Sequence, residues 1–275
     1  MLVFYLLLAS ALLLSLAAVW LIHRSRKYES LGQKTAKKIA EDESIHIIVH
    51  EIRAPVVAIK ESASVMLSDN MPKEEETKLL SLIHEQAGKL LDQISKILDS
   101  AKVEEGKLVL NKAAGNLSEV IKNEMDLFMP EARRKNIKLT ASVEENLPVF
   151  FFDSVRITEA INNLISNSLK YTNDNGSVTI SVVTDDTYRK TKSGGNVMIS
   201  VADTGIGISE EKQHMLFQKF TDLNANASTE AKTLSSGLGL YITKGIIQAH
   251  GGLVTINSIE GKGTTVTFNL PIRQN

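Results

Sequence analysis

Cysteine is absent from this sequence, so neither a disulfide nor a thiolate metal site can form. The six histidines are scattered without ligand-like spacing, which disfavours a metal held by protein side chains alone. An excess of either charge is also lacking, because 31 basic residues face 32 acidic ones. Nucleic-acid-binding domains usually carry a basic excess, so we expect no direct binding of nucleic acid. Apolar residues are plentiful instead, and 43% of 275 residues is enough for one or two buried cores.

The first 22 residues carry no charged side chain. At about 1.5 Å per helical residue, this stretch would cross a hydrocarbon core of roughly 30 Å. A cleaved signal peptide is the rival interpretation, but it needs a basic start and a shorter apolar core, and neither is present. Arg24, Arg26 and Lys27 follow directly, and positive charge marks the cytoplasmic side of a span. We therefore predict a single-pass transmembrane helix over residues 1–22 and a cytoplasmic linker helix over residues 23–43.

Two heptad seams predict a helical hairpin over residues 44–106. In both seams the apolar steps alternate between three and four residues, as in coiled coils. The first seam is Ile45, Val49, Ile52, Val56, Ile59, Ala63 and Met66, and the second is Leu80, Ile83, Ala87, Leu90, Ile94, Ile97 and Ala101. Asn70 and Pro72 interrupt the pattern between them. Each seam is narrow on its own, so we expect two hairpins to pair as a homodimer with a four-helix bundle.

After Gly106 the apolar pattern changes. Alternating apolar and polar residues predict strands over residues 136–143, 177–183, 196–203, 253–259 and 264–270. Helical patterns lie near residues 117–132, 154–171 and 238–250. Helices that cover one face of a mixed sheet form an α/β sandwich, which we predict for residues 107–275. The chain is thus predicted to be multi-domain, with a transmembrane helix, an all-α hairpin and an α/β sandwich.

A titratable pair, His50 and Glu51, lies between two residues of the first seam, Val49 and Ile52. His50 lies one position past a seam residue, so its ring is expected to face solvent. Glu51 can hold the imidazole in one tautomer or take its proton as a general base. Pro55 removes a helical N–H and crowds the carbonyl of Glu51, so a kink there would loosen the backbone beside the histidine. A solvated pair with an incidental proline is the plain alternative.

Four polar residues stack on one face of the helix predicted over residues 154–171. Glu159, Asn163, Asn167 and Lys170 follow one another at steps of four, four and three. Three of them offer oxygen atoms to a hard cation such as Mg²⁺, and phosphate oxygens can complete its shell. Lys170 can reach a phosphate directly. A solvent-facing polar stripe is the alternative, although repeated asparagines are poor helix formers and need a reason.

Three glycine-rich turns lie beside predicted helices and strands. Asp203 ends a strand and can accept a hydrogen bond from an exocyclic amine, while Gly205 and Gly207 let backbone approach a flat base. Gly237 and Gly239 begin a helix, where free N–H groups suit phosphates. The third turn is GKGTT, which contains Gly261, Gly263 and Thr264. Each turn alone could be an ordinary tight turn or hairpin.

Phe217 and Phe220 precede a polar stretch of small residues that runs into the second glycine turn. This stretch is typical of a mobile lid fixed by two aromatic residues. A surface loop with core phenylalanines is the alternative.

In this order and combination the motifs resemble those of the bacterial sensor histidine kinases. The dimerisation and phosphoacceptor domain matches at HEIRAP. The ATP-binding domain, which gyrase, Hsp90 and the mismatch-repair ATPases share, matches at NNLISNSLKYT, DTGIGI, FQKF and GLGLYI. The resemblance covers about residues 44–272.

The resemblance implies a protein-histidine kinase of a two-component system that uses ATP and Mg²⁺. It would phosphorylate His50 with Glu51 as general base, then pass the phosphoryl group to an aspartate in the receiver domain of a response regulator. The implied nucleotide-binding residues are Asn163, Asn167, Lys170, Tyr171, Asp203, Gly205, Gly207, Lys219, Gly237, Leu238, Gly239 and Thr264. Asn167, with Asn163 and Glu159, would hold Mg²⁺ together with ATP. The implied location is the inner (cytoplasmic) membrane, with the catalytic part in the cytoplasm.

Three positions depart from the family's pattern. Ser235 stands where a glycine is usual, so the lid hinge would be stiffer. Asp222 stands where a basic residue often follows the second phenylalanine, which leaves Lys219 and Lys232 as lid cations. Ala54 replaces a threonine or asparagine that orients water for removal of phosphate from the regulator, so the resemblance implies weak phosphatase activity.

Two other functions stay open on the sequence alone. An ATPase whose nucleotide closes a dimer clamp would need a transducer domain after residue 275 and would have no use for HEIRAP. A scaffold without phosphoryl transfer is favoured by the three departures but not by the presence of His50, Asn163, Asn167, Asp203 and Gly207.

Overall fold

The computed structural model describes residues 48–49, 52–67, 72–191, 194–221 and 237–272. The predicted transmembrane and linker helices, the pair His50 and Glu51, and the departures at Asp222 and Ser235 lie outside these residues. Within the described ranges, none of the helices is both long enough and apolar enough to cross a membrane.

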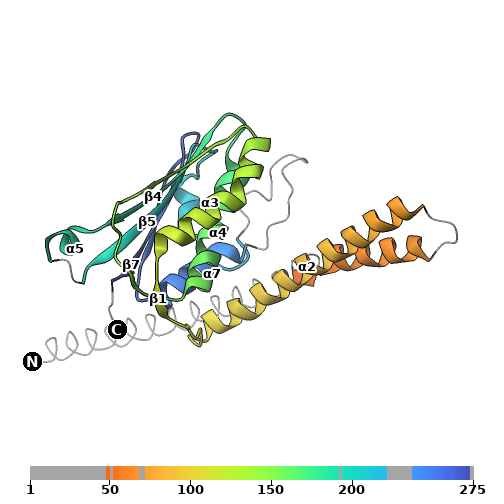
Figure 1. The fold of residues 1–275 in the computed structure, drawn as a ribbon, viewed down its shortest axis with the longest axis horizontal. Helices are drawn as coiled ribbons and strands as arrows, with labels where there is room; N and C mark the ends of the chain where they lie inside the picture. Colours follow the sequence, from red (N-terminus) through yellow and green to blue (C-terminus); the bar gives the residue numbers. More distant parts are fainter. Residues whose placement is uncertain (1–47, 50–51, 68–71, 192–193, 222–236, 273–275) are drawn as a thin grey trace, which may run out of the picture. The chain divides into compact units, whose positions relative to one another are not determined.

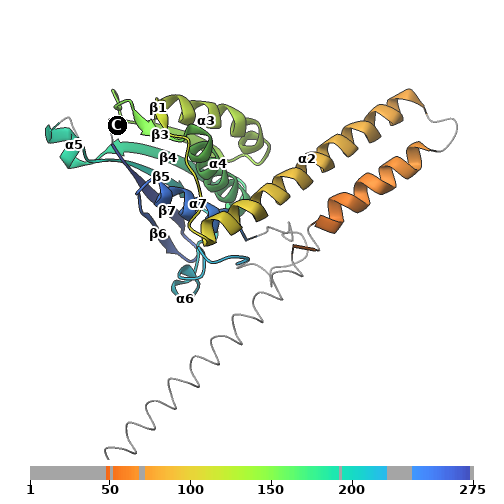
Figure 2. The same ribbon diagram turned by 90° about the horizontal axis from the view of Figure 1, so that it is seen from below.

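A helical hairpin occupies the N-terminal part of the described chain, as the two seams predict. Residues 52–66 form its first helix, and α2 (Lys73–Glu104) forms its second. The two helices lie side by side in both views (Figures 1 and 2). α2 begins with Glu74, Glu75 and Glu76, whose charges favour a helix N-terminus. Ion pairs four residues apart, such as Glu74 with Lys78, line its solvent side.

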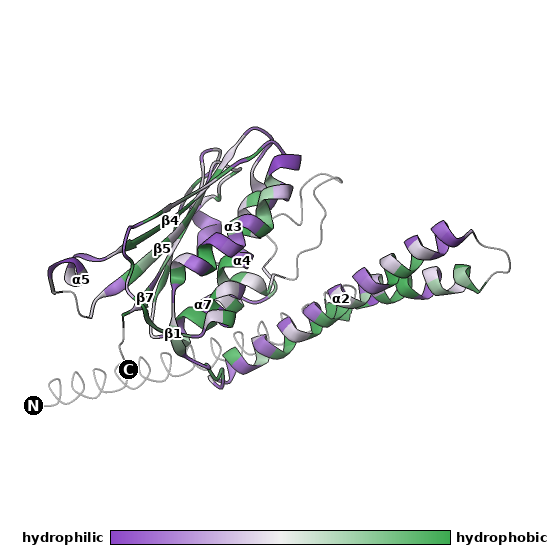
Figure 3. Cartoon of the chain, in the orientation of Figure 1, coloured by the Kyte–Doolittle hydropathy of each residue, from purple (hydrophilic) through white to green (hydrophobic). Residues whose placement is uncertain are grey.

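The second seam divides between two faces of α2. Ile83, Leu90 and Ile97 are partly buried, whereas Leu80 and Ile94 stay 51% and 40% exposed. Beside these two lie further exposed leucines, Leu91 and Leu98, which the single-seam prediction missed. Figure 3 shows apolar residues along both helices of the hairpin. One hairpin thus covers one apolar stripe and leaves a second stripe open, which we call the outer stripe: Leu80, Leu91, Ile94 and Leu98.

An α/β unit follows, built on a five-stranded sheet in the order β2-β4-β5-β7-β6. Its strands are β2 (Lys138–Val143), β4 (Ser177–Thr184), β5 (Asn196–Asp203), β6 (Val254–Ile259) and β7 (Gly263–Pro271). β2 and β4 run parallel, and the other neighbouring pairs run antiparallel. The five strands lie within one to two residues of the predicted ranges, so the mixed sheet is confirmed.

Three helices cover one face of this sheet: α3 (Leu117–Arg134), α4 (Ser154–Tyr171) and α7 (Gly239–Ala249) (Figures 1 and 2). Inward-facing strand residues pack beneath them, among them Val178, Ile180, Val182, Val197, Ile199 and Val201, all at most 1% exposed. The intervening residues of β4 and β5 are mostly only partly buried, which explains the alternation in the sequence.

Four short elements were not predicted. β1 (Ala113–Gly115) pairs antiparallel with β3 (Phe150–Phe152). α5 (Asp186–Thr191) lies between β4 and β5, and α6 (Glu210–Gln213) follows β5. Elements of three to six residues are too short to show a period in the sequence.

A buried histidine joins the two helices that carry the candidate site. Asp153 is the N-cap of α4, and its side chain accepts a hydrogen bond from the backbone N–H of Arg156. The backbone N–H of Asp153 donates in turn to Nε2 of His250, 3.0 Å away, at the C-terminus of α7. His250 Nδ1 lies 2.8 Å from the carbonyl of Ile246, which makes it the donor of that bond. Burial lowers the pKa of His250, so the ring is neutral in the fold.

Candidate functional site

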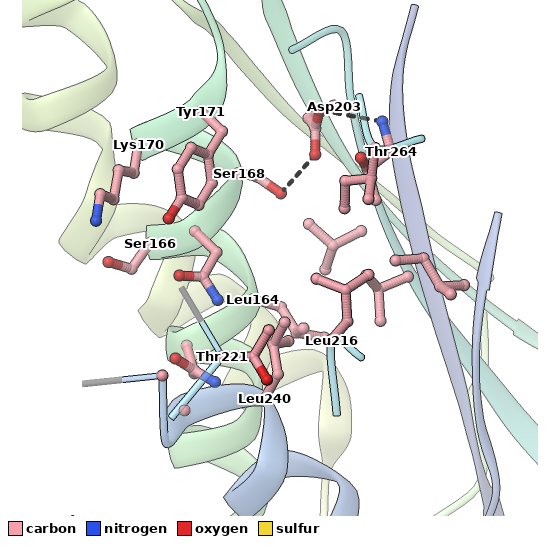
Figure 4. Close-up of a pocket in the computed structure, with 18 of the residues that line it drawn as sticks. Leu164, Ser166, Ser168, Lys170, Tyr171, Asp203, Leu216, Thr221, Leu240 and Thr264 are labelled. Atoms are coloured by element: carbon pink, nitrogen blue, oxygen red, sulfur yellow. Dashed lines mark hydrogen bonds between the residues drawn. The ribbon is translucent and has the colours of Figure 1, made fainter. Parts of the chain in front are cut away.

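A cavity of about 530 Å³ lies against the polar face of α4. Figure 4 shows Lys170 and Tyr171 on α4 and Asp203 across from them, beside Thr264. The cavity collects most of the predicted nucleotide-binding residues from four separate segments. They are Asn163, Asn167, Lys170, Tyr171, Asp203, Gly207, Gly237, Gly239 and Thr264. The volume falls in the range of roughly 300–1,000 Å³ that small-molecule sites occupy.

α4 places its asparagines by amphipathic spacing. Ile157, Ile161 and Ile165 are fully buried against the sheet, so residues on the opposite face turn to the cavity. There the side chain of Asn163 donates to Oγ1 of Thr243 in α7, at 2.9 Å. Within the described part of the chain, no hydrogen bond engages the Asn167 carboxamide, so its oxygen is available to a ligand.

Gly239 permits the close approach of α7 to Asn163. A Cβ at this position would lie 2.2 Å from Oδ1 of Asn163, closer than real side chains allow. Gly237, just before it, has φ +60°, a left-handed conformation that favours glycine. The turn thus brings the first N–H groups of α7 to the cavity, where they can bind phosphate oxygens.

Asp203 sits at the end of β5 and is held by three donors. Its Oδ1 accepts from the backbone N–H groups of Gly205, at 2.9 Å, and Thr264, at 3.2 Å. Its Oδ2 accepts from Oγ of Ser168 at 3.3 Å. Burial raises the pKa of Asp203, and these donors work against that rise. The fixed carboxylate can accept one further hydrogen bond, for example from an exocyclic amine.

Ser168 is a functional residue that the sequence argument missed. It is 7% exposed, lines the cavity and contacts the carboxylate of Asp203. The available signal was its place on α4, because a small polar residue at a buried helix position needs a hydrogen-bond partner.

Four predicted residues do not line the cavity. The carboxylate of Glu159 accepts a hydrogen bond from Arg156 at 2.8 Å, and its role as a metal ligand stays a prediction. Lys219 pairs with Glu104 at 2.6 Å. Gly205 lies behind Asp203, where a Cβ would come 2.4 Å from the carbonyl of Tyr171. Leu238 is buried in the core.

The predicted Mg²⁺ site is therefore brought together only in part, by Asn163 and Asn167. No group of three or more acidic or histidine side chains in the described residues could hold a metal by itself. This arrangement fits a cation that arrives with phosphate oxygens, since the two amides can supply oxygen ligands and leave the other positions to the nucleotide.

The reacting pair His50 and Glu51 lies outside the described residues, but its neighbours do not. Ala54 is exposed on the helix over residues 52–66, and Pro55 is buried in the same helix. Their roles and the kink at Pro55 stay predictions.

Two family models match the chain on either side of the hairpin's end. The first is the His Kinase A (phospho-acceptor) domain, over residues 40–106. The second is the Histidine kinase-, DNA gyrase B-, and HSP90-like ATPase, over residues 152–274. This chain carries the two domains of a histidine kinase. Among its curated relatives is the circadian input-output histidine kinase CikA of Synechococcus elongatus, 31% identical over 247 residues, or 88% of this chain and 31% of that protein.

A further relative is the non-motile and phage-resistance protein of Caulobacter vibrioides, 32% identical over 90% of this chain and 29% of that protein. The chain thus spans about a third of the length of these relatives. Among solved structures, ThkA in complex with the response regulator TrrA has a TM-score of 0.57 at 25% identity and covers 90% of this chain and 66% of that one. ShkA in complex with AMPPNP shares the fold, with a TM-score of 0.63 at 23% identity, over 85% of this chain and 46% of that one.

Proposed function

We propose that this protein is a homodimeric sensor histidine kinase that transfers the γ-phosphoryl group of ATP to His50. The proposal rests above all on the cavity, which unites Asn163, Asn167, Asp203 and Gly239 in a chain that also has a phospho-acceptor domain. A response regulator would receive the phosphoryl group on an aspartate, in line with the regulator bound to the similar kinase ThkA.

Each group in the cavity has a role in this reaction. Asp203 accepts from the adenine amine, and its three internal donors keep it in position. Lys170 and the N–H groups at the start of α7 bind phosphate oxygens. Mg²⁺, held by Asn167 and Asn163 with the phosphates, would neutralise charge on the triphosphate. Phosphoryl transfer needs mainly such positioning and charge neutralisation.

The transfer itself would take place at His50. A ring nitrogen attacks the γ-phosphorus, the bond from that phosphorus to the bridging β,γ-oxygen breaks, and ADP leaves. Glu51 takes the ring proton. The phosphoryl group then passes to a carboxylate oxygen of the regulator, and the imidazole is restored.

Homodimer formation is supported by the outer stripe of α2. Leu80, Leu91, Ile94 and Leu98 are between 40% and 67% exposed in one chain. A second hairpin that covers these side chains would remove a continuous apolar surface from water.

Anchoring in the inner membrane is part of the proposal. It is supported by 22 uncharged residues at the start of the sequence and by the basic residues that follow them. The catalytic part would then lie in the cytoplasm.

The direct test is incubation of the full chain with γ-labelled ATP and Mg²⁺. Acid-labile radiolabel on the protein is the expected result, because phosphohistidine hydrolyses in acid. His50→Gln and Asn167→Ala should each abolish it. Label that persists in His50→Gln would show that the acceptor is another residue, and a folded wild-type protein without label would favour a scaffold.

A further inference from the structure

The hairpin contributes a wall to the nucleotide cavity. Four residues of α2 line it together with the residues of α4 and α7: Lys89, Asp92, Gln93 and Lys96. They are spaced at steps of three, one and three, so they occupy one face of the helix. None of the motifs in the sequence pointed to this face.

An ion-pair clamp fixes the C-terminal end of α2 against α4. Arg156 donates two hydrogen bonds to Asp99, from Nη1 at 2.5 Å and from Nη2 at 3.1 Å. Burial alone would raise the pKa of Asp99, but hydrogen bonds from Arg156 and Lys102 outweigh it and hold this pKa below its usual value. The paired fork geometry of arginine and carboxylate specifies orientation as well as distance.

A close packing contact fixes the register of α2 on α7. Gly245 faces Val103, and a Cβ on this glycine would lie 2.5 Å from both Val103 methyl groups. On α2, Lys96 lies two turns, or about 10 Å, before Val103. On α7, Gly239 lies nearly two turns, or about 9 Å, before Gly245. Both Lys96 and Gly239 line the cavity.

Gln93, which lines the same cavity, carries an acceptor without a donor. Its Oε1 is buried and has no hydrogen-bond partner among the described residues. A buried amide oxygen without a donor lowers stability, so such atoms commonly bind water or a ligand. Gln93 lies nearly one turn before Lys96 on the same face of α2, and both residues line the cavity.

Two cationic side chains stand on this wall, each paired with an acid of α2. Lys89 and Lys96 outnumber Asp92 by one among the lining residues, and Lys89 pairs with Glu85 at 2.6 Å. Lys96 pairs with Asp92 at 2.6 Å, and its side chain is 37% exposed at the cavity. The pair joins residues of one helix turn, so the ammonium group can leave it by side-chain rotation alone.

We propose that α2 completes the nucleotide site: Lys96 binds the polyphosphate, and the side chain of Gln93 accepts a hydrogen bond from a ribose hydroxyl. This inference rests on the proposed nucleotide binding at Asp203. Its consequence is that nucleotide binding and docking of the hairpin stabilise each other, because the ligand touches both.

The test compares binding of ATP and of 2′,3′-dideoxy-ATP to the full chain by calorimetric titration. Lys96→Met keeps the length of the side chain and should weaken both nucleotides about fivefold, as expected for one hydrogen bond to a charged group that is partly screened. Gln93→Leu should weaken the binding of ATP severalfold and leave the affinity for dideoxy-ATP unchanged. Lys78→Met is the matched control, because it removes the same kind of ion pair, Lys78 with Glu74, further back on α2.

The outcomes separate this inference from the proposed function. If Asp203→Asn weakens ATP binding but Lys96→Met and Lys78→Met have the same ATP affinity, α2 is not a wall of the site. If Gln93→Leu weakens both nucleotides alike, the ribose contact is wrong. If ATP does not bind, or binds Asp203→Asn as well as wild type, the nucleotide site itself is wrong. In an Asp99→Asn background, which loosens the clamp, Lys96→Met should lose most of its effect, and a fully retained effect would refute the role of docking.

Discussion

Gly245 allows a prediction in which the sign of a mutational effect depends on a second residue. In the interior of a helix such as α7, Gly→Ala ordinarily stabilises by about 1 kcal/mol. Here the new methyl group would lie 2.5 Å from Val103, whose branched side chain cannot move aside without leaving its contact. Overpacking of this kind costs typically 1–3 kcal/mol. Gly245→Ala should therefore be neutral or destabilising by up to about 2 kcal/mol.

Removing the opposing methyl groups should reverse the result. In a Val103→Ala background the clash is gone, so Gly245→Ala should raise the free energy of unfolding by about 1 kcal/mol. The assay is urea unfolding of the full chain followed by circular dichroism, for wild type, both single variants and the double variant. A coupling of about 1–3 kcal/mol is expected from the cycle. Additive effects, with Gly245→Ala stabilising in both backgrounds, would refute the packing of α2 on α7.

Four further predictions concern other parts of the molecule. Asp203→Asn should weaken ATP binding by about 1–3 kcal/mol in titration calorimetry with the fold retained, and unchanged affinity would place the base elsewhere. The pKa of His250 is lowered in the fold, so the unfolded chain takes up a proton at a higher pH than the folded chain does. The free energy of unfolding should therefore be highest above pH about 6.5 and decrease as the pH falls below that value. His250→Gln should reduce this pH dependence. Ile94→Asp should give monomers in sedimentation, since a buried dimer interface cannot accept an unpaired charge, and a dimeric variant would contradict the bundle. Ala54→Thr should increase the rate at which phosphorylated regulator decays in the presence of ADP. If decay is already rapid with the wild-type protein and is no faster with the variant, the predicted weak phosphatase activity is wrong.

The main architecture could be read from the sequence because its elements are long and strongly periodic. β5 alternates over eight residues, and α4 buries isoleucines every four, so each matched one template. β1 and β3 were missed because three residues carry no period, and their pairing joins segments far apart in the chain. The outer stripe of α2 was missed because two adjacent apolar faces merge into one pattern when a helix is read alone.

The site could be predicted where backbone motifs determine it and not where tertiary contacts do. Asp203 and Gly239 follow from the turns that contain them. Glu159 matched the spacing of its neighbours, but Arg156, three residues before it, holds its carboxylate in an ion pair. No spacing rule reveals that competition, because Arg156 is positioned by Asp99 from a different domain. The wall formed by Lys96 was hidden for the same reason.

The C-terminal end of α2 meets the α/β unit at three segments far apart in the sequence. The contacts are Asp99 with Arg156, Val103 with Gly245 and Glu104 with Lys219. All three come from a stretch of six residues, so turning α2 about its axis would disturb them together. A helix advances about 100° per residue, and a rotation of that size would separate an ion pair and a packed valine in the same movement. Release of the hairpin should then be all-or-none, so that a gradual twist applied to the helix from its far end is converted into a single threshold event.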